Sequence, residues 1–427
     1  MKLKKSYFAT FGTTLLVAAA TLTTHAETWQ MVLPSPIAGA SPAGSGNDVL
    51  INPFTSAAAP GVFLATTFGG SDTKSLFRLT PTDAVSSAFV IEPVDGGLQS
   101  VTKLAHNPGD GLYAAGHAVS TGRKSSSSTM YWKVRRSKAS DQGNPSTWQD
   151  DDSFQFSTTA KNTTQPLNAR AMGIATDKDG KVTGNLFVCG WASDGKVNHW
   201  IIRKKSATGW ATVLDKQAAD TYSVALKMCF VPQGGNNPVA AHFVAGIFND
   251  KWTVLRSQNQ GASWQPVGPW PADGSQASAN DMASDSIGNI YVVGVRGRDS
   301  YNRGWVIRRS SDGGTTWEDL LDQPSQLDSW AVRLVIDGVN NITVAGAIDG
   351  VNGPRWAVVR NSPGQLWSDS WAAAGFPLGE NATGISKGRG MAADASGNLF
   401  LTGDVSSWTD STDGTLYSGT GLLRRVP

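Results

Sequence analysis

Two kinds of strand alternate along this chain, and their alternation limits the possible folds more than any other feature. One is a short apolar run that ends in Gly, such as NIYVVG at 289–294, and the other is an aromatic residue followed by basic residues, such as GWVIRRS at 304–310. Seven copies of each occur in strict alternation. The terminal Gly residues, 47 to 74 positions apart, are Gly69, Gly116, Gly190, Gly246, Gly294, Gly346 and Gly403. A period of about fifty residues with several short strands in each unit is typical of a β-propeller.

The repeat can be assigned to strands A to D, counted outward from the propeller axis. The Gly-terminated run is strand B, the aromatic-basic run is strand C, and strand D begins at a second Trp (Trp148, Trp210, Trp264, Trp317 and Trp367). The last unit ends at strand C, whereas residues 28–34 (TWQMVLP) resemble a strand D with no unit of its own. We therefore predict an all-β fold, in which residues 27–427 form a single seven-bladed β-propeller with four-stranded blades. The N-terminal strand would complete the last blade and close the ring.

The N-terminus has the pattern of a secretory signal peptide. Lys2, Lys4 and Lys5 precede an apolar run at 8–22, and small residues follow up to Ala26. We expect cleavage near Ala26, which would leave a secreted or periplasmic protein. The alternative, an N-terminal membrane anchor, is disfavoured because the apolar run is short for a span.

Charge and cysteine content limit the partners of the mature chain. Removing the three N-terminal Lys from a net charge of +2 leaves −1, which gives no general reason to bind nucleic acid or a membrane surface. No later segment is apolar enough to span a bilayer, and we expect a monomer. Cys189 and Cys229 could form a disulfide or remain buried thiols, and the sequence leaves both possibilities open.

The stretch SSDGGTTW carries a turn signature made of Ser310, Asp312, Gly314, Thr316 and Trp317. The Asp can accept backbone N–H groups of its own turn, the Gly permits positive φ, and the Trp anchors the returning strand. This stretch resembles the Asp-box of sialidase-like (BNR) repeats, and a weaker copy at 257–264 has Asn259 in place of the Asp. DSIGNIYVVG and DASGNLFLTG resemble the SBBP propeller repeats of exported bacterial proteins. Together these resemblances imply the fold but not an activity, since one such scaffold hosts hydrolases, lyases and lectins.

Sialidase activity does not follow from the resemblance. The early Phe/Tyr-Arg-Ile-Pro motif of that family is missing from the sequence. Arg170, Arg333 and Arg389 lie on predicted A strands, but at different distances from the turn that follows. Strand alternation would then point some of them away from a common site.

A ligand would be expected at the face that carries the B–C loops, over the central channel. We predict a carbohydrate-binding surface there, with aromatic residues stacking on sugar rings and Arg residues binding carboxylate or sulfate groups. The candidate binding residues are Trp191, Arg296, Arg298, Tyr301, Arg303, Trp330, Arg389 and Trp408. The alternative for each residue is a solvated loop position with no role.

Catalysis has weaker support in the sequence. Glycoside hydrolysis needs two opposed carboxyl groups, which Asp281 with Asp299 or Asp404 could supply. A lyase would need a base beside an Arg-rich site, which Tyr301 could provide. His spacing predicts no metal, and we find no cofactor motif. The primary prediction is thus a non-catalytic module that binds a glycan, a polysaccharide or another extracellular protein; a glycosidase or lyase and a structural envelope scaffold are the alternatives.

Overall fold

A computed structural model describes residues 28–33, 45–55, 61–67, 75–81, 89–95, 97–121, 128–157, 166–176, 185–219, 222–235, 237–272, 274–297, 303–323, 329–350, 353–361, 387–393, 399–409 and 416–426. Within them, almost all regular structure is β-strand. Two short 3-10 helices, η1 (Ala139–Asp141) and η2 (Pro145–Thr147), lie between β8 and β9, whose bounds are given below. The prediction of an all-β chain is confirmed.

The strands form antiparallel sheets that follow one another along the chain. The first group is β2 (Ser45–Ile51), β3 (Val62–Thr67), β4 (Leu76–Pro81) and β5 (Phe89–Asp95), and a single pair, Thr67 with Ser100, connects it to the next. That next group is β6 (Ser100–Asn107), β7 (Gly111–Thr121), β8 (Ser128–Lys138) and β9 (Gln149–Phe154). A four-stranded sheet follows, made of β10 (Ala169–Thr176), β11 (Leu186–Ser193), β12 (Asn198–Ser206) and β13 (Gly209–Gln217).

The second half of the chain repeats this organisation. One sheet contains β14 (Val224–Val231), β15 (Ala241–Phe248), β16 (Lys251–Ser257) and β17 (Gln265–Trp270), and the next contains β18 (Ala277–Ser284), β19 (Ile290–Arg296), β20 (Gly304–Ser310) and β21 (Glu318–Gln323). Three described strands follow, β22 (Ser329–Ile336), β23 (Ile342–Gly350) and β24 (Gly353–Asn361). The last sheet has the order β1-β27-β26-β25, in which β1 (Thr28–Leu33) pairs with β27 (Leu416–Val426), next to β26 (Leu399–Thr409) and β25 (Lys387–Ala393).

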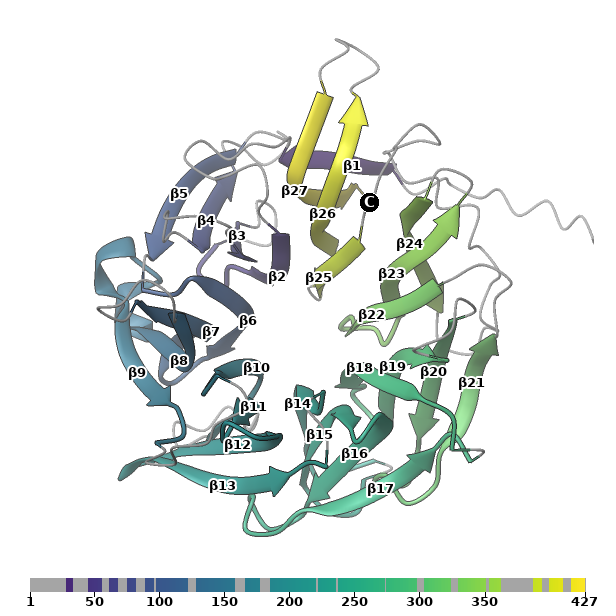
Figure 1. Cartoon of the computed structure of the whole chain (residues 1–427). Coiled ribbons are helices and arrows are strands. Elements are labelled where there is room, and N and C mark those ends of the chain that lie inside the picture. The colour runs from purple at the N-terminus through teal and green to yellow at the C-terminus, as the bar shows by residue number, and fades with distance from the viewer. Residues whose placement is uncertain are drawn as a thin grey trace, which may run out of the picture.

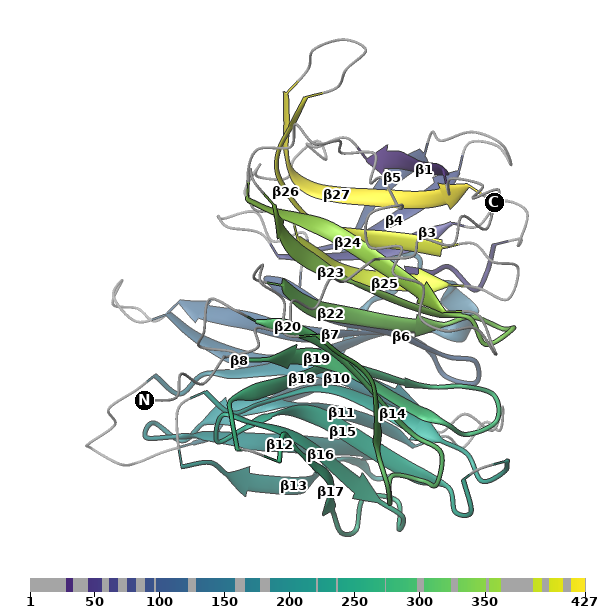
Figure 2. The ribbon, with the colours of Figure 1, turned by 90° about the vertical axis from the view of Figure 1, so that its right-hand side faces the viewer.

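These sheets stand like propeller blades around a common centre, with β2, β6, β10, β14, β18, β22 and β25 innermost (Figure 1). The side view shows the sheets stacked with their strands roughly parallel to one another (Figure 2). The core lies between neighbouring sheets: one buried cluster combines Phe187 and Trp200 of one sheet with Ala225 and Val244 of the next. The start of each inner strand and the B–C loops share one end of the axis, here called the loop face, and the A–B turns lie at the opposite end.

The repeated Gly and Trp residues fit together between neighbouring sheets. Gly294 of β19 faces a bulge in β18, and a Cβ added to it would lie 1.9 Å from the Ser278 carbonyl oxygen and 2.8 Å from Cζ3 of Trp252 in the preceding sheet. The same contact recurs where Trp200 meets Gly246, and the Trp200 indole donates a hydrogen bond to the Ile247 carbonyl at 2.8 Å. The Gly therefore leaves room for the indole of the neighbouring sheet, which explains why the two strand types alternate.

We expect Gly294→Ala to lower the free energy of unfolding by about 1–3 kcal/mol, because the added methyl group forces the inner strand or Trp252 to move. Gly209→Ala is a useful comparison, since a Cβ there meets no atom within 4 Å, although φ is +110°. Its cost should come from backbone strain alone, about 1 kcal/mol. Urea unfolding of both variants measures the difference; equal losses would contradict a steric role for Gly294.

The Asp-box is a structural turn between β20 and β21. The Asp312 carboxylate accepts backbone N–H groups of Thr315 and Thr316 at 2.9 and 2.8 Å, and Gly313 and Gly314 have φ of +70° and +87°. Trp317 donates its indole N–H to the Gly314 carbonyl at 3.1 Å. The roles predicted for Asp, Gly and Trp in this turn are confirmed.

In the weaker copy of this turn, Asn259 performs the same function. Its side-chain oxygen accepts the Ser263 N–H at 2.9 Å. Both turns are also tied to the preceding sheet, because Arg256 donates to the Gly313 carbonyl at 2.7 Å and Lys204 to the Gln260 carbonyl at 3.0 Å. The repeat is thus peripheral and structural.

For Asp312→Ala we expect a loss of about 1–3 kcal/mol of unfolding free energy, and for Asp312→Asn a smaller loss, because Asn259 supports an equivalent turn. Burial opposes ionisation of Asp312, but the hydrogen bonds from Thr316 outweigh it and hold the pKa of Asp312 below its usual range. The carboxylate therefore stabilises the fold above the unfolded pKa of about 3.9, and this contribution disappears as pH falls through the lower folded pKa. Unfolding titrations from neutral to acidic pH check this, and an Asn variant with the same acid dependence as the parent would contradict it.

Candidate functional site

The inner strands bring charged side chains together near the axis. Each described inner strand has a β-bulge close to its start, and the residue just after the bulge occupies the same position in every sheet. We call the charged residues of this row the axial belt: Asp48, Lys103, Lys227, Asp281 and Arg333. Gly173 and Gly390 fill the remaining two positions. The belt contains three cations and two carboxylates.

Two buried ion pairs organise the belt. Lys103 lies 2.7 Å from Oδ1 of Asp48, and Lys227 lies 2.9 Å from Oδ1 of Asp281. The other oxygen of each carboxylate accepts a backbone N–H of a neighbouring inner strand, from Leu104 at 2.8 Å and from Leu334 at 2.9 Å. Each Asp thereby connects one sheet to the next.

Burial and neighbouring charges change the protonation of the belt. Burial lowers the pKa of Lys103 to about 8, against the attraction of Asp48. Burial also opposes the charged form of Lys227, but Asp281 outweighs it and raises the pKa of Lys227. Burial likewise opposes ionisation of Asp281, yet the positive charges of Lys227, Arg333 and Lys103 lower its pKa, so that Asp281 is an anion at neutral pH.

Asp281, a candidate carboxyl group for glycoside hydrolysis, lies in the axial belt and is not placed to act as an acid or base on a sugar. Its side chain is 1% exposed and fully used by Lys227, by Leu334 and by the N–H of Met282 at 2.9 Å. A carboxylate held in this way is neither accessible to a sugar nor free to take up a proton.

Arg170 is the most unusual group near the loop face. It lies at the start of β10, where its guanidinium donates to the Ser100 hydroxyl at 3.1 Å, and its buried Nε has no hydrogen-bond partner. No carboxylate within the described ranges forms an ion pair with it. Burial, and secondly the positive charge of Arg389, lowers the pKa of Arg170 to about 10. Arg170 therefore carries a positive charge that no described carboxylate neutralises through an ion pair.

Arg333 approaches the same group of residues from β22. Its guanidinium donates to the carbonyls of Val332 and Asn47 at 3.2 and 3.3 Å, and its buried Nε is also unpartnered. The Asn47 amide in turn lies 3.5 Å from the Ser100 hydroxyl that Arg170 contacts. Ser100 and Asn47 thus connect two guanidinium groups from distant parts of the chain.

The three Arg residues of the predicted A strands differ in their register. The register shows that Arg170, Arg333 and Arg389 occupy three different positions relative to the bulge, as expected. Arg170 and Arg333 nevertheless both reach the group formed by Ser100 and Asn47. Arg389 differs in having a carboxylate partner, Asp404, at 2.8 Å.

Aromatic residues flank this group. Trp191 is the cross-strand neighbour of Arg170 and is half-buried. The Arg303 guanidinium lies over the ring of Trp330, which is at the start of β22, at 4.7 Å from the ring centre. His117, the cross-strand neighbour of Ser100, is buried with an unpartnered Nδ1, and burial lowers its pKa to about 3, so it is neutral.

Arg296 lies away from this group, and the structure does not describe the side chains of the remaining candidates. Arg296 forms an ion pair with Asp322 at 2.8 Å and lies over the Trp270 ring, which is a structural role at the outer strands. Arg298, Asp299 and Tyr301 fall outside the described residues. Trp408 belongs to β26, whose backbone is described there, but its side chain is not.

Sequence reasoning missed the remaining belt residues, Asp48, Lys103 and Lys227, and also Ser100 and His117. The only signal was positional and incomplete: Lys103, Asp281 and Arg333 each stand 13 residues before the strand-B Gly of their unit, whereas Lys227 and Asp48 stand 19 and 21 residues before theirs.

Cys189 and Cys229 are free thiols, and burial raises the pKa of both. In the described part of the chain, no group of three or more His, Cys, Asp or Glu side chains is placed to hold a metal ion. Nor does any helix in those ranges have the length and apolar character to cross a membrane.

Comparison with known proteins adds fold-level likeness only. No family model matches the chain, and no curated protein matches it. Among solved structures, the polysaccharide lyase Uly1 gives a TM-score of 0.47 at 13% identity over 89% of each chain. A protein of unknown function from Dyadobacter fermentans gives 0.44 at 11% identity, over 93% of this chain and 99% of that one. An α-L-arabinanase from Penicillium chrysogenum gives 0.33 at 12% identity, over 60% and 81%. At these values the likenesses carry nothing about the activity of this chain.

Proposed function

We propose that this protein is a secreted, seven-bladed β-propeller that binds an anionic carbohydrate at its loop face without cleaving it. In this proposal the pairing of β1 with β27 closes the ring, and residues 1–26 are removed on export. The ligand's carboxylate or sulfate group lies against Arg170 and Arg333, and a sugar ring lies beside Trp191.

The state of Arg170 carries the proposal. A partly buried guanidinium is costly unless an anion and hydrogen-bond acceptors compensate it. Arg170 has one hydroxyl partner and an unpartnered Nε, and Arg333 has only backbone carbonyls and an unpartnered Nε. A bound carboxylate or sulfate would supply the missing acceptors, and Arg is suited to both groups because of its planar array of donors.

Carbohydrate is the favoured carrier of that anion because of the adjacent aromatic surface. Trp191 offers part of an indole next to Arg170, and the paired Trp330 and Arg303 form a second flat surface at the same end. Aromatic faces and guanidinium planes next to each other suit the apolar face and the charged group of one acidic sugar.

A non-catalytic role is favoured because both described carboxylate candidates are occupied: Asp281 by Lys227 and two N–H groups, and Asp404 by Arg389. The alternative of a glycosidase or lyase would depend on Asp299 and Tyr301.

A polysaccharide panel tests this function. Mature protein is incubated with polyuronates, sulfated glycans and neutral glucans, and both retention on the polymer and release of reducing ends or unsaturated uronates are measured. We expect retention by acidic polymers, weakened by salt, with no released products. Release of products would show that the protein is an enzyme and not a non-catalytic binding module. Equal retention on neutral glucans would refute recognition of an anion.

A further inference from the structure

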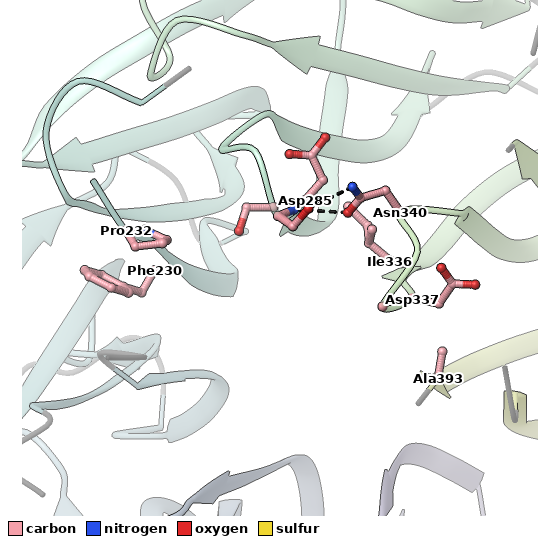
Figure 3. Close-up of a pocket in the computed structure, with 10 residues that line it drawn as sticks. Phe230, Pro232, Asp285, Ile336, Asp337, Asn340 and Ala393 are labelled. Carbon is pink, nitrogen blue, oxygen red and sulfur yellow. Dashed lines mark hydrogen bonds between the residues drawn. The ribbon is translucent and has the colours of Figure 1, made fainter. Parts of the chain in front are cut away.

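A cavity lies at the end of the axis opposite the loop face, among the A–B turns. It has a volume of about 410 Å³, within the range of small-molecule sites. Its lining comes from consecutive parts of the ring: Phe230, Pro232, Ser284, Asp285, Ser286, Ile336, Asp337, Gly338, Asn340 and Ala393. In Figure 3, Phe230 and Pro232 lie across an open space from Asp337, Asn340 and Ala393.

The two carboxylates of the cavity are fully engaged in their own turns. Asp285 accepts the N–H groups of Ile287 and Asn289, the Asn289 amide at 2.7 Å and the Tyr291 hydroxyl at 3.2 Å. Asp337 accepts the N–H groups of Val339 and Asn341, the Asn341 amide and Arg360 in the same way. These carboxylates shape the turns and retain little capacity to hold a cation.

The cavity also lacks the means to hold an anion, since no Lys or Arg is among its described lining residues. What remains is one apolar wall and one polar wall, whose two carboxylates are engaged in their own turns. Phe230, half-buried with its ring 4.9 Å from that of His242, forms the apolar wall with Pro232, while Ile336 and Ala393 add further apolar surface.

The polar wall is held in place by hydrogen bonds between neighbouring turns. The Asn340 side-chain oxygen accepts the Ser286 N–H at 3.1 Å, and its amide donates to the Ser286 hydroxyl at 2.8 Å (Figure 3). The Ser286 hydroxyl thus keeps its own proton to donate. The Ser284 hydroxyl has no hydrogen-bond partner among the described residues.

We infer that this cavity is a second binding site, which takes one neutral hexose-sized ring with its apolar face against Phe230 and its hydroxyl edge toward Ser284 and Ser286. A sugar ring combines an apolar face with a hydroxyl rim, which matches the two walls. The inference is independent of the loop-face site, because it uses different residues at the other end of the molecule.

The test uses mature protein with glucose, galactose, mannose and N-acetylglucosamine as probes, by saturation-transfer NMR and calorimetry at concentrations on the order of millimolar. We expect at least one of these sugars to bind, Phe230→Ala to weaken it about tenfold, and Ala393→Phe, which fills the cavity, to abolish it. Ser284→Ala provides a mild variant that keeps the fold and should weaken binding about fivefold. Arg170→Met is the control and should leave hexose binding unchanged.

Failure of all four sugars to bind would overturn the inference. So would hexose binding that survives both Ala393→Phe and Ser284→Ala, or that disappears in Arg170→Met, since it would then take place at the loop face. Melting curves of each variant distinguish a loss of sugar binding from a loss of folded protein.

Discussion

Asp281→Ala should lower the free energy of unfolding by about 3–5 kcal/mol, the largest stability effect expected in this chain. The substitution leaves Lys227 as an uncompensated charge near the axis and removes the acceptor of the Leu334 N–H, so it affects three neighbouring inner strands. Urea unfolding followed by Trp fluorescence and circular dichroism measures the loss.

Two comparisons separate the buried pair from a general charge effect. Asp150→Ala removes a carboxylate that is 59% exposed and paired with Lys133, and should cost about 1 kcal/mol or less. The double variant Asp281→Asn with Lys227→Met keeps an acceptor for the backbone and removes both charges, so it should recover most of the loss. A double variant no more stable than Asp281→Ala would show that the ion pair is not the source of the effect.

Arg170→Met should weaken binding of acidic polysaccharide by about 2–5 kcal/mol, or roughly thirtyfold or more. The variant removes the buried donors that no described carboxylate satisfies, while methionine retains much of the apolar stem. Removing an uncompensated buried charge should also leave stability unchanged or raise it, opposite in sign to Asp281→Ala.

Arg309→Met is a suitable control for Arg170→Met, because Arg309 forms an exposed ion pair with Glu318 of the neighbouring strand β21 and should not affect binding. Binding lost equally in both variants would indicate a nonspecific charge effect rather than a site.

The strand repeat could be predicted because each of its residues has a local role. Gly294 leaves room for a Trp of the preceding sheet, and Asp312 accepts a backbone N–H group of its own turn. Requirements of this kind leave a periodic signal in the sequence. Such signals can be recognised in the sequence without knowledge of the three-dimensional arrangement.

The site could not be predicted in the same way, because it depends on register. A bulge near the start of each inner strand shifts the following residues by one position, which turns Asp281 away from the loop face and into the axial belt. Arg170 and Arg333 come from β10 and β22, yet both reach the group formed by Asn47 and Ser100. No pattern within a single unit of the strand repeat indicates that these two Arg residues reach the same group.

The central claim is recognition of an anionic carbohydrate at Arg170, and one titration tests it most directly. The mature protein and its Arg170→Met variant are titrated by calorimetry with a polyuronate and with the same polymer fully methyl-esterified, which removes the charge and keeps the sugar. We predict binding of the free acid by the parent protein, little binding of the ester, and loss of the difference in the variant. Equal affinity for acid and ester, or undiminished binding of the acid by Arg170→Met, would contradict the proposed function.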